Sequence, residues 1–143
     1  MRVVPKAVLL GLLVDVGGTL VAALVLFTLN ALLAGGVGAV RGVTPDLERL
    51  PESPWFLAQT VVVGTGFSLL GGYVAGRLAP GAERLNGAVF AVLTTSLGLL
   101  LPEGEGPKTP GWLTTLSVAL CLAAALLGAE LSRRERAGAP PEG

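Results

Sequence analysis

Long apolar runs constrain this sequence more than any other feature. The first extends from Ala7 to Val40 and contains a single charged residue, Asp15. A helix on the surface of a soluble protein needs a polar face, whereas a helix that is apolar on all sides is buried or crosses a membrane. About 20 apolar residues are enough to cross the hydrocarbon core of a bilayer. We therefore expect an integral membrane protein. The charged fraction of 14% agrees with this, since soluble domains have about 25%.

Four apolar runs are expected to be transmembrane helices. They cover approximately residues 7–34, 55–79, 85–101 and 112–131. Prolines lie at the predicted ends, such as Pro54, Pro80 and Pro102, and proline is typical of helix boundaries because it has no amide N–H and disrupts a helix interior. The predicted fold class is therefore all-α, a polytopic membrane protein with one four-helix transmembrane bundle over residues 1–132. A disordered cytoplasmic tail is expected over residues 133–143.

The basic residues favour cytoplasmic termini. With four spans, both termini and the loop between the second and third helices share one side of the membrane. That side holds seven basic residues and the other side holds three. By the positive-inside rule, both termini are therefore expected on the cytoplasmic side of a bacterial inner membrane. The seven are Arg2, Lys6, Arg77, Arg84, Arg133, Arg134 and Arg136. The formal net charge is zero, so nucleic acid is not an expected partner.

The composition argues against enzymatic and metal-dependent chemistry. The chain contains no histidine, so Ser-His and Cys-His nucleophile pairs and HExxH metal sites cannot form. The one cysteine, Cys121, lies inside the fourth span and is interpreted as a small packing residue. Asp15 alone cannot supply the paired carboxylates of an aspartyl protease. No catalytic residue, metal ligand or cofactor is predicted.

Small residues recur at four-residue spacing and predict close helix packing. In the second span, such a ridge begins at Thr60, and small-xxx-small ridges let helix backbones approach each other in lipid. The first span has a similar face that includes Asp15, and the third contributes Gly87 near its start. The residues expected to pack helices are Gly11, Gly18, Gly64, Ser68, Gly72, Gly76 and Gly87. Besides the lipid bilayer, the expected partners are further copies of the same chain or a larger membrane complex.

Asp15 is the most unusual residue of the first span. An aspartate at the centre of a bilayer costs roughly 2.5 to 3.5 kcal/mol, so it is expected to face protein or water and to find polar partners. Tyr73 and Thr95 lie at comparable depth on other helices, and the long side chain of Arg77 can reach inward. We therefore take Asp15, Arg77, Tyr73 and Thr95 as a candidate polar or ion site.

Three interpretations of Asp15 remain open. It is a structural carboxylate, a hydrated residue near the interface, or a proton or cation site. The first is favoured, since a proton relay usually needs several titratable groups and the spans hold no other acid before Glu130. The sequence thus predicts a small structural or accessory membrane protein without catalytic activity. The alternative is a small transporter or channel subunit that uses Asp15 as its coupling residue.

The run "GGYVAGRLAPGAERLNGAVFAVLTTSLG", residues 71–98, resembles a segment of small, uncharacterised bacterial membrane proteins. In these, a glycine-rich second helix ends in "GGYVAGR" and a third helix opens with "NGA". The resemblance implies four helices and an inner-membrane location, and it carries no assigned activity. At this junction Asn86 is expected to cap the third helix. In the loop after the first span, Thr44 is expected to begin a short helix.

Overall fold

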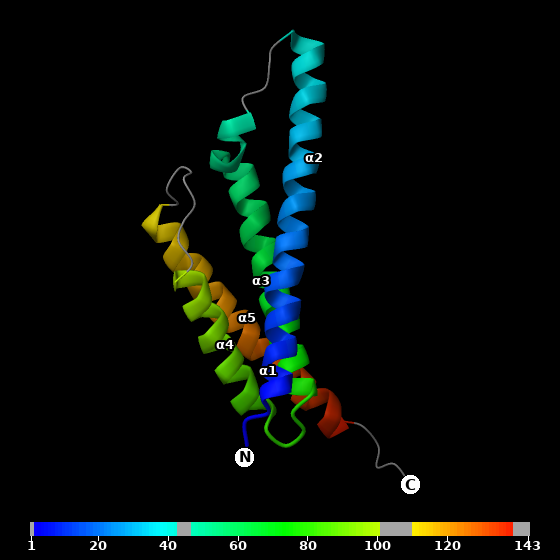
Figure 1. Ribbon diagram of the computed structural model, residues 1–143, viewed down its shortest axis with the longest axis vertical. Helices are drawn as coiled ribbons and strands as arrows, with labels where there is room; N and C mark the ends of the chain where they lie inside the picture. Colours follow the sequence, from blue (N-terminus) through cyan, green and yellow to red (C-terminus); the bar gives the residue numbers. More distant parts are fainter. Residues whose placement is uncertain (1, 43–46, 101–109, 139–143) are drawn as a thin grey trace.

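The structure is a computed structural model that describes residues 2–42, 47–100 and 110–138, and in these ranges it is helical with no strand. The elements are α1 (Pro5–Leu12), a π-helical turn η1 (Leu13–Gly17), α2 (Gly18–Arg41), a 3-10 helix η2 (Leu47–Glu52), α3 (Pro54–Arg77), α4 (Glu83–Leu100) and α5 (Gly111–Gly138). Together α1, η1 and α2 make one long rod (Figure 1). The predicted all-α class is confirmed.

Three of the helices are long and apolar enough to cross a membrane by length and composition. They cover Pro5–Gly38, Pro54–Arg77 and Gly111–Gly138. The remaining helix, α4, has 18 residues and begins with Glu83, Arg84 and Asn86, so its short length includes a polar first turn. The structure therefore supports a membrane protein with three candidate spans.

The helices converge at one end of the molecule and diverge at the other (Figure 1). We call the first the closed end; it holds α1, the turn at residues 78–82 and the C-terminal part of α5. We call the second the open end. There α2 lies with the first half of α3, while α4 and the start of α5 form a separate pair.

The buried apolar core lies towards the closed end. Val8 of α1, Ala75 of α3, Phe90 and Ala91 of α4, and Ala125 of α5 form one cluster. Phe90 has no exposed surface, and its ring lies against the backbones of α1 and α3. Four helices thus meet around one aromatic side chain.

Small residues allow α3 and α5 to pack with their backbones in contact. A Cβ added to Gly72 would overlap the carbonyl of Ala125, and one added to Gly128 would overlap the carbonyl of Leu69. A Cβ added to Gly11 of α1 would lie 2.7 Å from the carbonyl oxygen of Gly71. Contacts of this kind stabilise helix pairs in lipid, where burial of apolar surface gives little advantage.

Five of the six glycines predicted to pack helices lie at such contacts. Beside Gly11 and Gly72, these are Gly76 against Ser132 and Ala129, Gly87 against Ala129, and Gly18 against the Phe67 ring. Gly64 differs, because a Cβ added there meets no described atom within 4 Å. The four-residue spacing of small residues on α3 therefore extends to Gly64, beyond the part of α3 where a neighbouring helix lies close.

The C-terminal helix is longer than predicted. We expected a disordered tail from Arg133, but α5 continues to Gly138, and residues 139–143 lie outside the described ranges. Glu130 accepts hydrogen bonds from Arg133 at 2.6 Å and from Arg134 at 3.3 Å. Pairs at these spacings stabilise the helix that contains them, which accounts for the extra turns.

Asn86 does not cap its own helix as predicted. It lies in the first turn of α4 and is fully buried. Its Oδ1 accepts a hydrogen bond from the backbone N–H of Val4 at 2.7 Å, and its Nδ2 donates to the carbonyl of Ala82 at 2.9 Å. Asn86 therefore fastens the segment before α1 to α4. The predicted cap at Thr44 lies outside the described residues.

Candidate functional site

Asp15 lies in the single π-helical turn found in the described residues. The turn covers Leu13–Gly17, between α1 and α2. Single π-turns within α-helices are uncommon and are frequently found at functional sites. The Asp15 residue is 6% exposed, so its carboxylate is directed into the protein.

Two hydroxyl groups from different helices bind the carboxylate. Ser68 of α3 donates from Oγ to Oδ1 of Asp15 at 3.0 Å, and Thr94 of α4 donates from Oγ1 to Oδ2. Each carboxylate oxygen can accept about two hydrogen bonds, so each retains one free acceptor position. Asp15 forms no ion pair with any residue that the structure describes.

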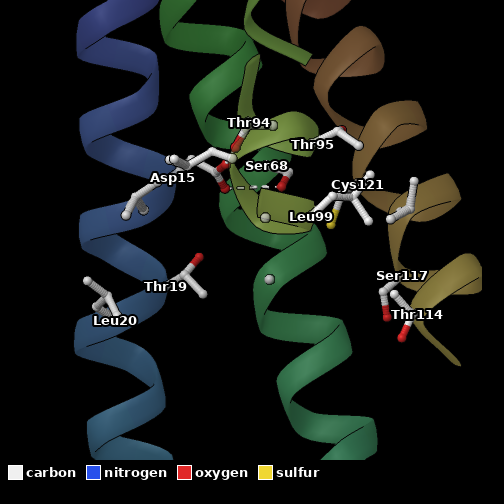
Figure 2. A pocket seen from close by; sticks show the side chains of 15 residues that line it. Asp15, Thr19, Leu20, Ser68, Thr94, Thr95, Leu99, Thr114, Ser117 and Cys121 are labelled. Carbon is white, nitrogen blue, oxygen red and sulfur yellow. Dashed lines mark hydrogen bonds between the residues drawn. The ribbon is translucent and has the colours of Figure 1, made fainter. Parts of the chain in front are cut away.

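A cleft of about 390 Å³ opens beside the carboxylate, towards the open end. Figure 2 shows Asp15 and Thr19 on one side of it and the α5 residues Thr114, Ser117 and Cys121 on the other. The lining residues are Asp15, Val16, Thr19, Leu20, Gly64, Ser68, Thr94, Thr95, Leu97, Gly98, Leu99, Thr114, Ser117, Val118 and Cys121. Asp15 is the only charged residue among them.

Thr95 lines the cleft next to Thr94 but does not bind Asp15 (Figure 2). Its Oγ1 is buried and has no hydrogen-bond partner in the described part of the chain, and the same holds for Oγ1 of Thr65. Most buried hydroxyl groups in native proteins have a partner. These two hydroxyl groups are therefore exceptions among the described residues.

The structure separates Arg77 and Tyr73 from Asp15. Arg77 donates from Nη1 to the Tyr73 hydroxyl at 2.8 Å and to Oε2 of Glu135 at 3.0 Å. Tyr73 in turn donates to the same Glu135 oxygen at 2.6 Å. The Arg77 and Glu135 side chains are more than half exposed. The four residues predicted as one site thus fall into two groups, one in the cleft and one at the closed end.

A second ion-pair group joins α4 and α5 at the closed end. Glu130 accepts a hydrogen bond from Nε of Arg84 at 2.9 Å, in addition to its pairs within α5. Arg136 lies 3.9 Å from Glu83 and donates to the carbonyl of Arg77. These arginines therefore have protein partners in Glu130 and Glu83, which the sequence analysis did not assign.

A polar pair between α2 and α3 was also missed. Asn30 donates from Nδ2 to Oε1 of Gln59 at 2.8 Å. One turn away, the Phe27 and Phe56 rings pack edge to face, with their centroids 6.4 Å apart. An amide on each of two apolar helices is the signal that could have found the pair, because such groups seek each other in lipid.

Comparison with known proteins does not assign the chain to a family. No family model, no curated protein and no solved structure matches the chain. The resemblance noted for residues 71–98 therefore remains a prediction.

Proposed function

We propose that the chain is a four-pass protein of a bacterial inner membrane with both termini in the cytoplasm. At 1.5 Å per residue, α4 is about 27 Å long, which nearly matches a hydrocarbon core of about 30 Å. It runs beside α3 and α5, so its polar first turn lies at the closed end. The basic residues of that turn and of the end of α5 gather there as well, which favours a cytoplasmic closed end.

Within that protein, we propose that Asp15 binds a proton or a cation as the coupling residue of a small transporter or channel subunit. The observation that carries the proposal is the buried Asp15 carboxylate at the wall of the 390 Å³ cleft. Acidic residues inside membrane spans typically mark ion or substrate pathways. Counted from Pro5, Asp15 is about 15 Å along the helix, close to the middle of the bilayer.

A purely structural role explains less of the geometry. Asparagine at position 15 would keep an acceptor for Ser68 and could pair with Thr94, whose hydroxyl both donates and accepts. It would do so without the insertion cost of an aspartate. A structural role also gives no reason for the adjoining cleft and its unpartnered Thr95 hydroxyl.

The accessory role expected from the sequence remains the second candidate. Its support is the glycine seam at Gly11, Gly72 and Gly87, together with the two hydroxyl groups that already bind Asp15. In that case Asp15 is a packing residue that holds α1, α3 and α4 together. The two candidates differ in the effect of removing the charge while the hydrogen bonds are kept.

The test compares the wild type with Asp15→Asn, Asp15→Leu and the control Thr28→Val. Thr28 is exposed and donates only to the carbonyl of Leu24, so its loss should change neither stability nor transport. Thermal unfolding is measured in lipid nanodiscs, and proton flux is measured in proteoliposomes that contain a pH-sensitive dye. We expect Asp15→Asn to unfold like the wild type and to lose proton flux that the wild type and Thr28→Val retain.

Two results would contradict the proposal. One is an Asp15→Asn protein with the proton flux of the wild type. The other is a wild type without flux, combined with a Leu variant that is less stable, since unpaired buried hydroxyl groups cost about 1 to 3 kcal/mol each. The second result would favour the accessory role.

A further inference from the structure

The chemistry of the cleft restricts what Asp15 can bind. Among the residues that the structure describes, the lining contains one carboxylate and no basic residue, so the local charge favours a cation. A proton alone needs no space of 390 Å³. Cavities that bind small molecules typically measure about 300 to 1,000 Å³. The volume therefore fits a small organic molecule.

The donor set does not suit a divalent metal. Such ions are bound by several carboxylates, imidazoles or thiolates. The described residues contain no group of three or more His, Cys, Asp and Glu side chains that could hold one. Asp15 with neighbouring hydroxyl groups supplies one negative charge, which matches a monovalent cation.

The walls of the cleft favour an apolar body on that cation. Aliphatic side chains from three helices line it, namely Val16, Leu97, Leu99 and Val118. A hydrated inorganic ion gains little from contact with such walls, whereas an alkyl chain packs against them. Asp15 is the one charged group among the described lining residues, as expected for a ligand with one charged end.

Hydrogen bonding distinguishes a primary ammonium from a quaternary one. A primary ammonium has three N–H donors, and each Asp15 oxygen keeps an acceptor position beside the hydroxyl group of Ser68 or Thr94. A quaternary ammonium has no N–H and is usually bound by aromatic rings. None of the lining residues is aromatic.

We propose that the cleft binds a primary alkylammonium ion, with its charged end on Asp15 and its alkyl chain along Val16 and Val118. The inference rests on the proposed cation-binding function of Asp15 and names the class of its ligand.

The test uses the full chain in lipid nanodiscs and isothermal titration calorimetry at pH 7. The probes are hexylammonium, neutral 1-hexanol and hexyltrimethylammonium, which share one alkyl chain. Because all three also partition into lipid, each titration is compared with the Asp15→Asn protein. We expect saturable binding of hexylammonium to the wild type, weakened about tenfold or more in Asp15→Asn, as for loss of a hydrogen-bonded charge.

Two comparisons make the test specific. The affinity for hexylammonium should stay unchanged in the control Thr28→Val. Hexyltrimethylammonium and 1-hexanol should bind at least about tenfold more weakly than hexylammonium. Equal titrations in the wild type and Asp15→Asn, or equal affinities for the primary and quaternary ions, would overturn the inference.

The outcome also separates this inference from the function on which it rests. Proton flux that depends on Asp15, without binding of hexylammonium, refutes only the ligand class. Absence of both refutes the cation site as well.

Discussion

Replacement of Gly72 by alanine tests whether the contact between α3 and α5 holds the bundle together. A Cβ at position 72 would overlap the backbone carbonyl of Ala125, and its next nearest atoms are also backbone atoms of that residue. Backbone cannot rotate away as a flexible side chain can, so the helices must separate. Overpacking of this kind costs about 1 to 3 kcal/mol. We expect Gly72→Ala to lower the free energy of unfolding by about this amount.

Gly66 supplies a matched control on the same helix. It is exposed, and a Cβ added there meets nothing within 4 Å. Alanine is a better helix former than glycine by about 0.5 to 1 kcal/mol, so Gly66→Ala should be neutral or stabilising. Because the same gain in helix propensity applies to both variants, they should differ by the overpacking cost alone, roughly 1 to 3 kcal/mol.

The assay is equilibrium unfolding in mixed detergent micelles, followed by circular dichroism and by fluorescence of the two tryptophans. Both variants carry the same added methyl group, so effects of composition cancel in their difference. A Gly72→Ala protein as stable as Gly66→Ala would refute the close contact of α3 and α5.

Two further predictions concern polar contacts. A double-mutant cycle of Asn30→Leu and Gln59→Leu, measured by unfolding in micelles, should give a coupling free energy of about 0.6 kcal/mol, the average for hydrogen bonds between membrane helices. Additive effects of the two substitutions would show that the amides do not interact. Backbone N–H groups of Glu83 and Gly81 hold the pKa of the Glu83 carboxyl below its ordinary value of 4.5. A lowered pKa stabilises the fold above pH 4.5 and the effect disappears as the pH falls below it, so Glu83→Gln should be less stable than the wild type at pH 7 and the difference should shrink towards pH 3.

The position of Asp15 could be predicted from the sequence, but its partners only in part. Its place on a small-residue face correctly indicated close neighbours, and Ser68 lies at the matching depth on α3. The sequence could not decide between Thr94 and Thr95 as the partner of Asp15. Adjacent residues point about 100° apart on a helix, and the rotation of α4 about its axis is set by packing. The structure places Thr94 on the carboxylate and Thr95 in the cleft wall.

The expected pairing of Asp15 with Arg77 fails for a reason of distance. Ser68, which contacts Asp15, lies nine residues before Arg77 on α3, about 13.5 Å along the helix axis. An arginine side chain does not cover that distance, and Arg77 instead pairs with Glu135. That partner was hidden by the predicted tail, since disorder was inferred from polar composition. The local pairs of Glu130 with Arg133 and Arg134 extend the helix, and the Arg84–Glu130 pair depends on how α4 packs against α5.

The glycine seam and the cleft are consequences of the same change in side-chain size along α3. At Gly72 the helix presents hydrogen atoms, and α5 approaches until backbones touch. One turn earlier, at Ser68, the side chain turns to Asp15, and at Gly64 no neighbouring helix fills the space that a glycine leaves. Asp15 thus lies where the two helix pairs begin to diverge, and its hydrogen bonds to α3 and α4 join them at that point. A cation on this carboxylate would bind the same two oxygen atoms, at the acceptor positions that Ser68 and Thr94 leave free.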